Sequence, residues 1–416
     1  MLFRHKSLGN VAFYNNEKII LGKSACYFNL LHGINKFYLK LLINTSYFLE
    51  YAFKNATGTT IKNVSLKSMR LFLVPLSPLA EQKRIVSKVD ELMALCDKLE
   101  ARRQKKQELQ RKLNSSALDR MLTAENQEEF EQHWQRICEN FDLLYDNPEN
   151  VEKLRKAILQ LAVQGKLVEQ NPEDEPASVL IEKIQVEKKR LVKEGKIREI
   201  KISPPLDITE IAYELPQGWE WCRWNDISMQ IGDLDHKMPL ECEEGIPYVS
   251  PKDFYDNNGI NFITAKKISR EDFERLRQKI QPEKNDIIFP RYGTIGENRF
   301  VVTENKFLAS YSCAVIKSMN EMMEPKYSYY YSLSPLIKSE IIKYINKTTQ
   351  PNVGLKSIQM FVYPLPPLNE QKRIVEKVEQ LMGLCDELEL KLRKAREDSE
   401  KLLEMVVRAL LEGAAA

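Results

Sequence analysis

The sequence predicts an α+β protein in which two globular α/β regions, the first of them partial, are separated by two long antiparallel helices that form a coiled coil. Three observations predict this class. A long segment is duplicated, each copy contains a heptad pattern, and the stretches before the copies are rich in aromatic and β-branched residues, which favour strands. The predicted order is a first globular region, a long helix, a helical connector, a second globular region and a second long helix, with bounds at 1–77, 78–123, 124–204, 205–366 and 367–411.

The duplication is the strongest of these observations. The segment EQKRIVSKVDELMALCDKLE, which starts at Glu81, returns as EQKRIVEKVEQLMGLCDELE at Glu370, so the offset is 370 − 81 = 289 residues. This offset holds without a gap back to Thr59 and Thr348. Solenoid and propeller repeats have periods of roughly 20 to 50 residues, so a whole domain with its helix has been copied. We therefore expect a target that also has two parts.

Each copy continues as a long helix. A proline-rich breaker precedes it, at 74–78 and at 363–367, and proline ends strands and can open helices. In the second copy, apolar residues recur at alternating spacings of four and three from Ile374 through Leu381 to Ala395. This pattern is typical of a coiled coil. Because the repeat has pseudo-two-fold character, we expect the two helices to bury their apolar seams against each other in antiparallel orientation.

The two globular regions differ in length. The second has 348 − 205 = 143 residues before the shared segment, and the first has 58. SLGNVAF at Ser7 matches TIGENRF at Thr294. We therefore expect the first region to lack its N-terminal half, and its core to need cover from a partner or from a missing segment.

Composition limits the class of protein. The 416 residues carry a net charge of +3, which neither demands nor excludes nucleic acid. The seven cysteines form no Cys-x-x-Cys pair and the four histidines are scattered, so no zinc site is expected. No apolar run reaches the roughly 18 residues of a membrane span, and the start of the chain has no hydrophobic signal region. We expect a soluble cytoplasmic protein with no membrane partner.

Catalytic motifs are not found. LGKS at 21–24 lacks the first glycine of a phosphate-binding loop, and DNPEN at 146–150 lacks the second proline and the aromatic residue of an amino-methyltransferase motif. An acid-x-lysine spacing typical of nuclease metal sites occurs at both helix starts, Glu81-x-Lys83 and Glu370-x-Lys372. Glutamate in a first helical turn more often stabilises the helix dipole. We expect a non-catalytic chain that itself holds no metal and no cofactor.

Several long segments carry a family resemblance. They are PLSPLAEQKRIVSKVDELM and PLPPLNEQKRIVEKVEQLM at the helix starts, LRKAILQLAVQGKLVEQNPEDEPASVLIEKI in the connector, and YELPQGWEWCRWNDI, GIPYVSPKDF and NDIIFPRYGTIGENRF in the second globular region. Together they cover nearly all of the chain after Thr59. With these segments the chain resembles the specificity subunit of type I restriction–modification enzymes.

The resemblance implies a subunit that performs no chemistry itself. Each globular region is then a target-recognition domain that reads one half of a bipartite sequence in double-stranded DNA. The helix pair sets the distance between the half-sites and docks two methyltransferase subunits, and two restriction subunits with motor and nuclease activity can join them. The cofactors implied are S-adenosylmethionine, ATP and Mg²⁺, all of them in the partner subunits. A rigid helical spacer suits half-sites about one DNA turn, roughly 34 Å, apart.

The short first domain leaves other interpretations open. Members of the family normally have this domain entire, opening with a segment like LPQGWEW at 215–221. The chain could instead be a truncated or half specificity subunit that self-associates and acts as a dimer on a symmetric site. It could also be a coiled-coil module that assembles proteins, or a catalytic methyltransferase or nuclease. A specificity subunit should bind DNA with an affinity that falls steeply as salt concentration rises, and a coiled-coil assembly module should not.

Loop residues with basic, amide, hydroxyl or phenol groups are the candidates for DNA contact. In the second domain they are Lys237, Lys252, Arg291, Tyr292, Lys347, Thr349 and Gln350, and in the first domain they are Thr59, Thr60, Arg4 and His5. Arg291 and Tyr292 directly follow the strand-like segment DIIFP and precede a glycine that lets the backbone approach DNA. Taken one at a time, each candidate is more often an ordinary solvated surface residue.

Candidates for partner binding stand at the starts of the duplicated helices. They are Glu81, Arg84, Glu370 and Arg373. The same polar residues appear in both copies, which favours a patch that faces a partner. Helix capping and local ion pairs, worth about 0.3–1 kcal/mol each, explain them equally well.

Overall fold

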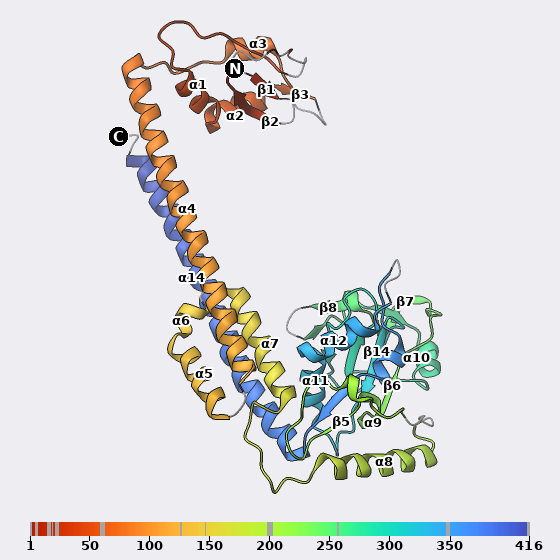
Figure 1. Ribbon diagram of the computed structural model, residues 1–416. Helices are drawn as coiled ribbons and strands as arrows, with labels where there is room; N and C mark the ends of the chain where they lie inside the picture. Colours follow the sequence, from red (N-terminus) through yellow and green to blue (C-terminus); the bar gives the residue numbers. More distant parts are fainter. Residues whose placement is uncertain are drawn as a thin grey trace. The chain divides into compact units, whose positions relative to one another are not determined.

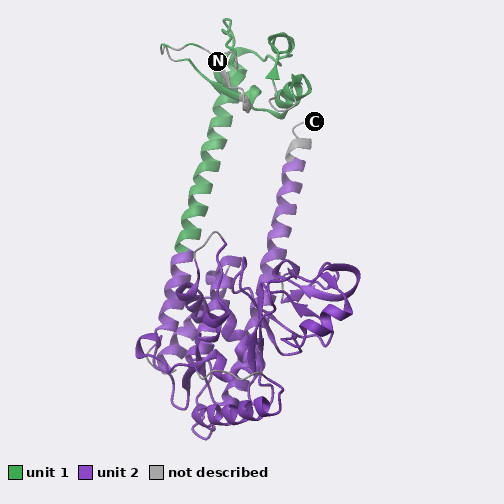
Figure 2. Ribbon diagram, turned by 90° about the vertical axis from the view of Figure 1, so that its right-hand side faces the viewer, with its two compact units in different colours: residues 1–109 green, residues 110–416 purple. Residues whose placement is uncertain are grey.

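The structure is a computed structural model that describes residues 2–4, 7–14, 18, 20, 25–58, 63–124, 127–145, 147–197, 203–255, 258–346 and 350–413. The chain forms two compact units, residues 1–109 and residues 110–416, and the boundary falls inside a long helix (Figure 2). The first unit holds the smaller globular part, and the second holds the connector and the larger globular part (Figure 1). In the described part of the chain, every helix is too short or too polar to span a membrane.

The first unit has a small helical core flanked by short strands. β1 (Leu2–Arg4) is antiparallel to β2 (Ser7–Ala12), and β3 (Ala56–Thr57) is antiparallel to β4 (Asn63–Val64). The short helices are α1 (Lys36–Ile43), α2 (Ser46–Lys54) and α3 (Leu66–Leu71). Asn35 and Thr45 begin α1 and α2, because their side-chain oxygens accept hydrogen bonds from backbone N–H groups of the first turn. The buried core consists of Leu39, Leu42, Ile43, Phe48 and Ala52.

Two long helices follow the proline-containing breakers, as the heptad pattern predicts. They are α4 (Leu79–Leu122) and α14 (Leu368–Gly413). Within the second unit, the last turns of α4 and the first half of α14 run in opposite directions (Figure 1). Leu118 and Met121 of α4 share a hydrophobic core with α14 there. The predicted class, mixed helix and strand with a long helix between two globular parts, is confirmed.

The first half of the α14 seam is buried against a helix of the connector. Ile374 and Val378 are fully buried, and Cys385 is nearly so, where α14 lies along α7 (Pro148–Gln164). Arg155 of α7 supports this contact by donating a hydrogen bond to the Asp386 carboxylate of α14 at 2.6 Å. From the sequence we predicted that the segment of α7 belongs to the connector. We did not predict that α7 would cover the apolar seam of α14.

The connector consists of α5 (Gln127–Glu139), α6 (Phe141–Leu144), α7 and α8 (Ala177–Lys193). Gly165 ends α7 in the left-handed conformation, with φ of 69°. A Cβ atom at Gly165 would lie 2.4 Å from the Cγ atom of Pro216, so only glycine fits there. The Tyr213 hydroxyl also donates to the Val163 carbonyl at 2.7 Å. These contacts dock the connector on the start of the larger globular part.

The larger globular part contains small sheets with helices packed around them (Figure 1). A four-stranded antiparallel sheet has the order β12 (Arg299–Phe300), β11 (Ile287–Pro290), β14 (Cys313–Lys317), β6 (Gln230–Gly232). A three-stranded sheet has the order β10 (Lys266–Ile268), β7 (Glu241–Val249), β13 (Leu308–Ala309), and a ribbon pairs β8 (Phe254–Tyr255) with β9 (Gly259–Ile260). The helices and 3₁₀ turns are η1 (Ile208–Glu210), α9 (Trp224–Ile227), η2 (Pro251–Asp253), α10 (Arg270–Leu276), α11 (Pro325–Leu333), α12 (Pro335–Tyr344) and α13 (Leu355–Gln359).

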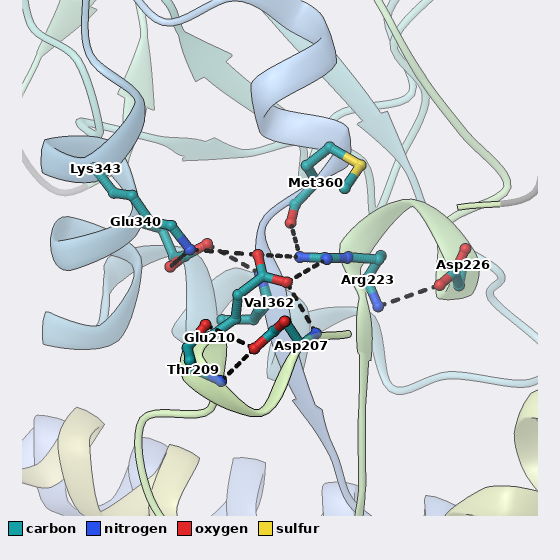
Figure 3. A network of polar contacts seen from close by, with 9 residues as sticks. All are labelled: Asp207, Thr209, Glu210, Arg223, Asp226, Glu340, Lys343, Met360 and Val362. Carbon is teal, nitrogen blue, oxygen red and sulfur yellow. Dashed lines mark hydrogen bonds and ion pairs between the residues drawn. The ribbon is translucent and has the colours of Figure 1, made fainter. Parts of the chain in front are cut away.

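The first and last strands of this globular part lie side by side. β5 (Glu220–Arg223) pairs antiparallel with β15 (Val362–Leu365). Figure 3 shows the polar network that fixes the pair, in which Arg223 donates to the Glu210 carboxylate at 2.7 Å and to the Met360 carbonyl at 2.9 Å. The Glu340 carboxylate accepts a hydrogen bond from the Val362 N–H at 3.2 Å. Because the Arg223 side chain is only 3% exposed, water competes little for these bonds.

A buried glutamine joins the smaller globular part to α4. Gln82 is fully buried although it lies in the polar sequence EQKR. Its Nε2 group donates to the Ser77 carbonyl at 2.7 Å, and its Oε1 atom accepts from the Asn35 N–H at 2.8 Å. Because Asn35 caps α1, Gln82 fixes the start of α1 to the breaker that precedes α4.

The second copy contains the same clamp. Gln371 is fully buried, donates to the Pro366 carbonyl at 2.9 Å and accepts from the N–H of Glu324, the cap of α11, at 3.0 Å. Each of the three residues lies 289 positions after its counterpart, as 371 − 82, 366 − 77 and 324 − 35 show. A tyrosine contact repeats at the same offset, since the hydroxyls of Tyr38 and Tyr327 donate to the carbonyls of Pro75 and Pro364. The repeated unit therefore reaches back to residue 35.

Candidate nucleic-acid interface

The loop after β11 carries the predicted residue Arg291, and the structure places its side chain inside the domain. The side chain is 8% exposed. Its Nε group donates to the Val353 carbonyl at 3.0 Å, and its Nη1 group forms an ion pair with Asp233, whose side chain is 15% exposed. Arg291 is thus a brace between loops in this structure. Its direct contact with a base stays a prediction.

Arg291 brings together three loops that the sequence analysis selected separately. Asp233 begins the segment that leads to Lys237, and the backbone carbonyl of Arg291 accepts from the Val353 N–H at 3.0 Å. Next to Arg291, Tyr292 forms an isolated β-bridge with Asn352. The loops at 233–240, 291–293 and 350–353 therefore form one continuous edge of the second globular part.

Three of the predicted DNA-contacting side chains are exposed in the second globular part. They are Lys237, Lys252 on the turn after β7, and Gln350. In the portion of the chain that the structure describes, neither lysine takes part in an ion pair. Their ammonium groups are therefore available to phosphate, the negatively charged group that dominates affinity for DNA. Lys347 and Thr349 lie outside the described residues.

An aromatic cluster adjoins Arg291 at the same edge. The ring of His236 lies 4.8 Å from that of Tyr311 and 6.5 Å from that of Tyr292, centroid to centroid. The guanidinium of Arg291 is 5.7 Å from the Tyr292 ring. His236 and Tyr311 could not be predicted from the sequence, because only the tertiary structure brings them together. In the sequence, only the position of His236 directly before the candidate Lys237 could have indicated a role for this histidine.

The first globular part gives less information about its candidate residues. Thr59, Thr60 and His5 lie outside the described residues. Arg4 is the last residue of β1. These four positions stay predictions.

The two helix starts place equivalent residues in different surroundings. Glu81 and Arg84 are exposed in the first turns of α4. Glu370, the equivalent of Glu81, is 1% exposed, and its Oε2 atom accepts a hydrogen bond from the indole N–H of Trp219 at 2.9 Å. The Glu370 side chain thus holds the start of the second globular part instead of facing outward. Partner contact stays a prediction for Glu81, Arg84, Glu370 and Arg373.

Burial also changes the acidity of Glu370. Loss of hydration raises the pKa of this carboxyl group to about 7, although the hydrogen bond from Trp219 opposes the rise. Arg373 lies nearby and is bonded to Asp174 at 2.7 Å. Arg373 lowers and Asp174 raises the pKa of Glu370. The second copy therefore carries a titrating group at the junction of helix and domain.

The described ranges contain no cluster of histidine, cysteine, aspartate or glutamate side chains that could hold a metal ion. What they present at the loop edge is the exposed Lys237 beside aromatic rings, together with the exposed amide side chain of Gln350. Ammonium groups bind phosphates, and amide and aromatic side chains can contact base edges. The second globular part carries this edge, and the junction of globular part and long helix that holds it is present twice in the chain.

Residues 5–111 and 216–395 match the family model of the type I restriction modification DNA specificity domain. The chain therefore belongs to this family. It is 30% identical to the specificity subunit of the type I restriction enzyme EcoAI from Escherichia coli over 396 residues, and 30% identical to that of EcoEI from Escherichia coli over 398 residues. Each alignment covers 91% of this chain and 65% of the relative, so the chain spans just under two thirds of the length of these proteins.

Solved structures also match the chain. The HsdS subunit from Thermoanaerobacter tengcongensis matches with a TM-score of 0.40 and 18% identity, over 91% of this chain and 70% of that chain. A structure described as addressing complex assembly and conformational transition of the type I R-M system matches with a TM-score of 0.49 and 18% identity, over 91% of this chain and 72% of that chain.

Proposed function

We propose that this chain is the DNA-sequence-recognition subunit of a type I restriction–modification complex and that it performs no chemistry itself. Its family and the specificity subunits among its relatives support this function. The observation that carries the proposal is the repeated clamp at Gln82 and Gln371. Two copies of a unit in which a globular part is fixed to a long helix suit a target with two half-sites.

The second globular part binds its half-site through the loop edge that Arg291 braces. Lys237 and Lys252 contact phosphates, which gives affinity through the release of counterions. Tyr292 and Gln350 contact base edges, which gives specificity. This division of roles follows from exposure, since the two lysines and Gln350 are exposed and the Arg291 guanidinium is not.

The proposed partners are double-stranded DNA, two methyltransferase subunits and, in a restriction complex, two motor–nuclease subunits. S-adenosylmethionine belongs to the methyltransferases, and ATP with Mg²⁺ belongs to the motor–nuclease subunits. The complex works in the cytoplasm, where the DNA of a bacterial cell is found. The chain contributes the choice of sequence and the frame on which the partners assemble.

The test is co-expression of the chain with a type I methyltransferase subunit, followed by genome-wide mapping of N6-methyladenine. Cells with the methyltransferase subunit alone are the control. A bipartite motif with two different halves supports the proposal and assigns a half-site to each globular part. A palindromic motif with one half-site repeated would show that two chains act together through their second globular parts. Absence of methylation by a stable, purified complex would contradict the proposed function.

A further inference from the structure

Three aromatic side chains from three separate loops form one cluster at the loop edge of the second globular part. The ring of His236 lies 4.8 Å from that of Tyr311 and 6.5 Å from that of Tyr292, and the two tyrosine rings lie 6.3 Å apart, centroid to centroid. Each ring thus contacts the other two. His236 is exposed and both tyrosines are half-buried. Rings that pack on one side and stay open to water on the other are typical of binding surfaces.

Backbone hydrogen bonds hold the segment that supports the cluster. The Ser310 N–H donates to the Val249 carbonyl at 2.7 Å. On the other side of Tyr311, the Ser312 carbonyl accepts from the N–H of Arg291 at 2.8 Å. Tyr311 therefore stands between two anchored residues, and the imidazole that packs against it rests on a fixed support. Reading a base needs such a support, because small displacements break the contact.

The charges around the cluster suit an anionic ligand. Two carboxylates precede His236 in its loop, and both are paired, Asp233 with Arg291 and Asp235 with Lys279. Lys237 follows directly and takes part in no ion pair within the described part of the chain. Lys252 likewise has no such pair and stands on the turn after Val249, the residue that holds Ser310. Two unpaired lysines thus flank the aromatic cluster on adjoining segments, and phosphates are the groups they would bind.

The polar atoms of the cluster are not used within the domain. No hydrogen bond joins the ring nitrogens of His236, or the hydroxyls of Tyr292 and Tyr311, to another residue that the structure describes. A neutral imidazole has one N–H donor, and a protonated one has two. Each purine presents its N7 atom as an acceptor in the major groove of DNA, and guanine adds O6. The free N–H of His236 therefore matches the edge of a purine.

The end of the same loop exposes apolar side chains. Met238 is 47% exposed and Leu240 is 85% exposed. Apolar side chains on a loop that contacted only phosphates would gain nothing, whereas within the major groove they contact the methyl group of thymine. The loop at 235–240 thus combines a phosphate-binding lysine with groups that suit the edges of bases.

We propose that the loop at 235–240 enters the major groove of the second half-site and that His236 selects one purine there by donating a ring N–H to its N7 atom. This inference rests on the proposed function, since it names the residue that determines one base of the target. Tyr311 is a positioning residue that holds the imidazole through ring contact. A pyrimidine at the same position lacks the N7 acceptor and is rejected.

The first measurement is the methylation motif of the complex with a type I methyltransferase subunit, mapped for the parent chain, His236→Ala and His236→Phe. Phenylalanine keeps a ring against Tyr311 but has no N–H to donate. Both variants should accept every base at one purine position of one half-site and leave the rest of the motif and the spacer unchanged. Lys252→Ala, which removes a phosphate contact, should instead lower methylation at all sites without changing the motif. Because His236 is exposed, its variants should unfold at the temperature of the parent chain.

A second measurement tests the atom that His236 contacts. A duplex with the mapped target is compared with one in which the identified purine is replaced by its 7-deaza analogue, which has carbon in place of N7. By anisotropy, the parent complex should bind the 7-deaza duplex about tenfold more weakly. Complexes with His236→Ala or His236→Phe should bind both duplexes equally, because the donor is already absent.

Three outcomes would overturn this inference and leave the proposed function intact. The first is a motif that neither variant changes. The second is a parent motif that His236→Phe retains and His236→Ala loses, because the ring would then act by packing alone. The third is an equal effect of the 7-deaza purine on the parent chain and on both variants, because another group would then contact N7. Absence of methylation by the parent complex would overturn the proposed function, and this inference with it.

Discussion

Gln82 and Gln371 occupy the same position in the two copies, and each ties the cap of an earlier helix to the breaker before its own long helix. Both side chains are fully buried. Each clamp therefore fixes a globular part to its helix by hydrogen bonds that water cannot replace. The duplicated unit therefore includes the junction between globular part and long helix. A substitution at either glutamine should weaken this junction as well as the helix itself.

Gln371→Ala should destabilise the second unit. The substitution leaves the Glu324 N–H and the Pro366 carbonyl without their partner inside the protein, and a buried polar group without a partner costs about 1–3 kcal/mol. Urea denaturation measures the loss. Lys372→Ala changes the next residue, which is exposed, and should stay within about 0.5 kcal/mol of the parent chain. Equal stability of the two variants would contradict the role of the clamp.

Arg291→Ala should act mainly on the free energy of unfolding, because the Arg291 side chain is buried and braces the loops. Any loss of direct DNA contact should be the smaller effect. Removing the guanidinium leaves the half-buried Asp233 carboxylate with only the longer ion pair to Lys279, at 3.9 Å, which costs up to about 3 kcal/mol. Asp233→Ala should have an effect of similar size, and the double variant should be less destabilised than the sum of the two. Thermodynamic double-mutant analysis by urea denaturation gives this coupling. If Arg291→Ala alone weakened DNA binding while stability stayed unchanged, base contact would be its role.

Lys237→Ala should weaken DNA binding without loss of stability. The side chain is exposed, so folding should change by less than about 0.5 kcal/mol. Loss of one phosphate contact should reduce the slope of log affinity against log salt concentration by about 1 and act alike on all sequences. Anisotropy measurements on the complex at several salt concentrations give the slope. Lys401→Ala, an exposed lysine of α14, is the matched control and should leave the slope unchanged.

The stability of the second unit should fall as pH rises through the range between 4.5 and about 7. Burial raises the pKa of Glu370 above its value of 4.5 in the unfolded chain, so the folded state favours the protonated carboxyl group. Its contribution is fully present below pH 4.5 and is lost as pH passes about 7. Glu370→Gln stays neutral and keeps an acceptor for Trp219. This variant should therefore flatten the pH dependence measured by urea denaturation.

Two controls isolate the contribution of Glu370. Burial also raises the pKa of Asp286 to about 6, against the opposing effect of Lys317, and this adds a slope of the same sign. Only the difference between the parent chain and Glu370→Gln therefore reports on Glu370. Glu81→Gln changes the exposed equivalent and should leave the pH profile as it is. A profile that Glu370→Gln does not alter would refute the assignment.

The long helices could be predicted because their signals are local. The proline breakers and the heptad positions lie within a few residues of one another, and α4 and α14 begin just after them. The burial of Gln82 could not be predicted, because glutamine among charged residues normally indicates a solvated helix face. Its partner Asn35 lies 47 residues earlier, and only folding brings the two together.

The candidate interface could be predicted as a set of loops but not side chain by side chain. Composition selected Arg291 as a DNA contact, yet its partner Asp233 lies 58 residues away and turns it into a brace. The identical letters EQKR at Glu81 and Glu370 have opposite burial, because Trp219 covers only the second. Identical local sequence thus leads to different surroundings, which no pattern within the segment could indicate.

The pairing of β5 with β15 has a consequence for how such a protein can change. Neighbouring strands lie roughly 5 Å apart. The segments that lead into and out of residues 224–361 therefore lie next to each other. In the strand register, Arg223 lies opposite Val362 and Glu220 lies opposite Leu365. The residues between the two strands take no part in this pairing. A block that replaces residues 224–361 must therefore keep the contacts of Glu324 with Gln371 and of Tyr327 with Pro364, because these contacts tie the block to the helical frame outside it.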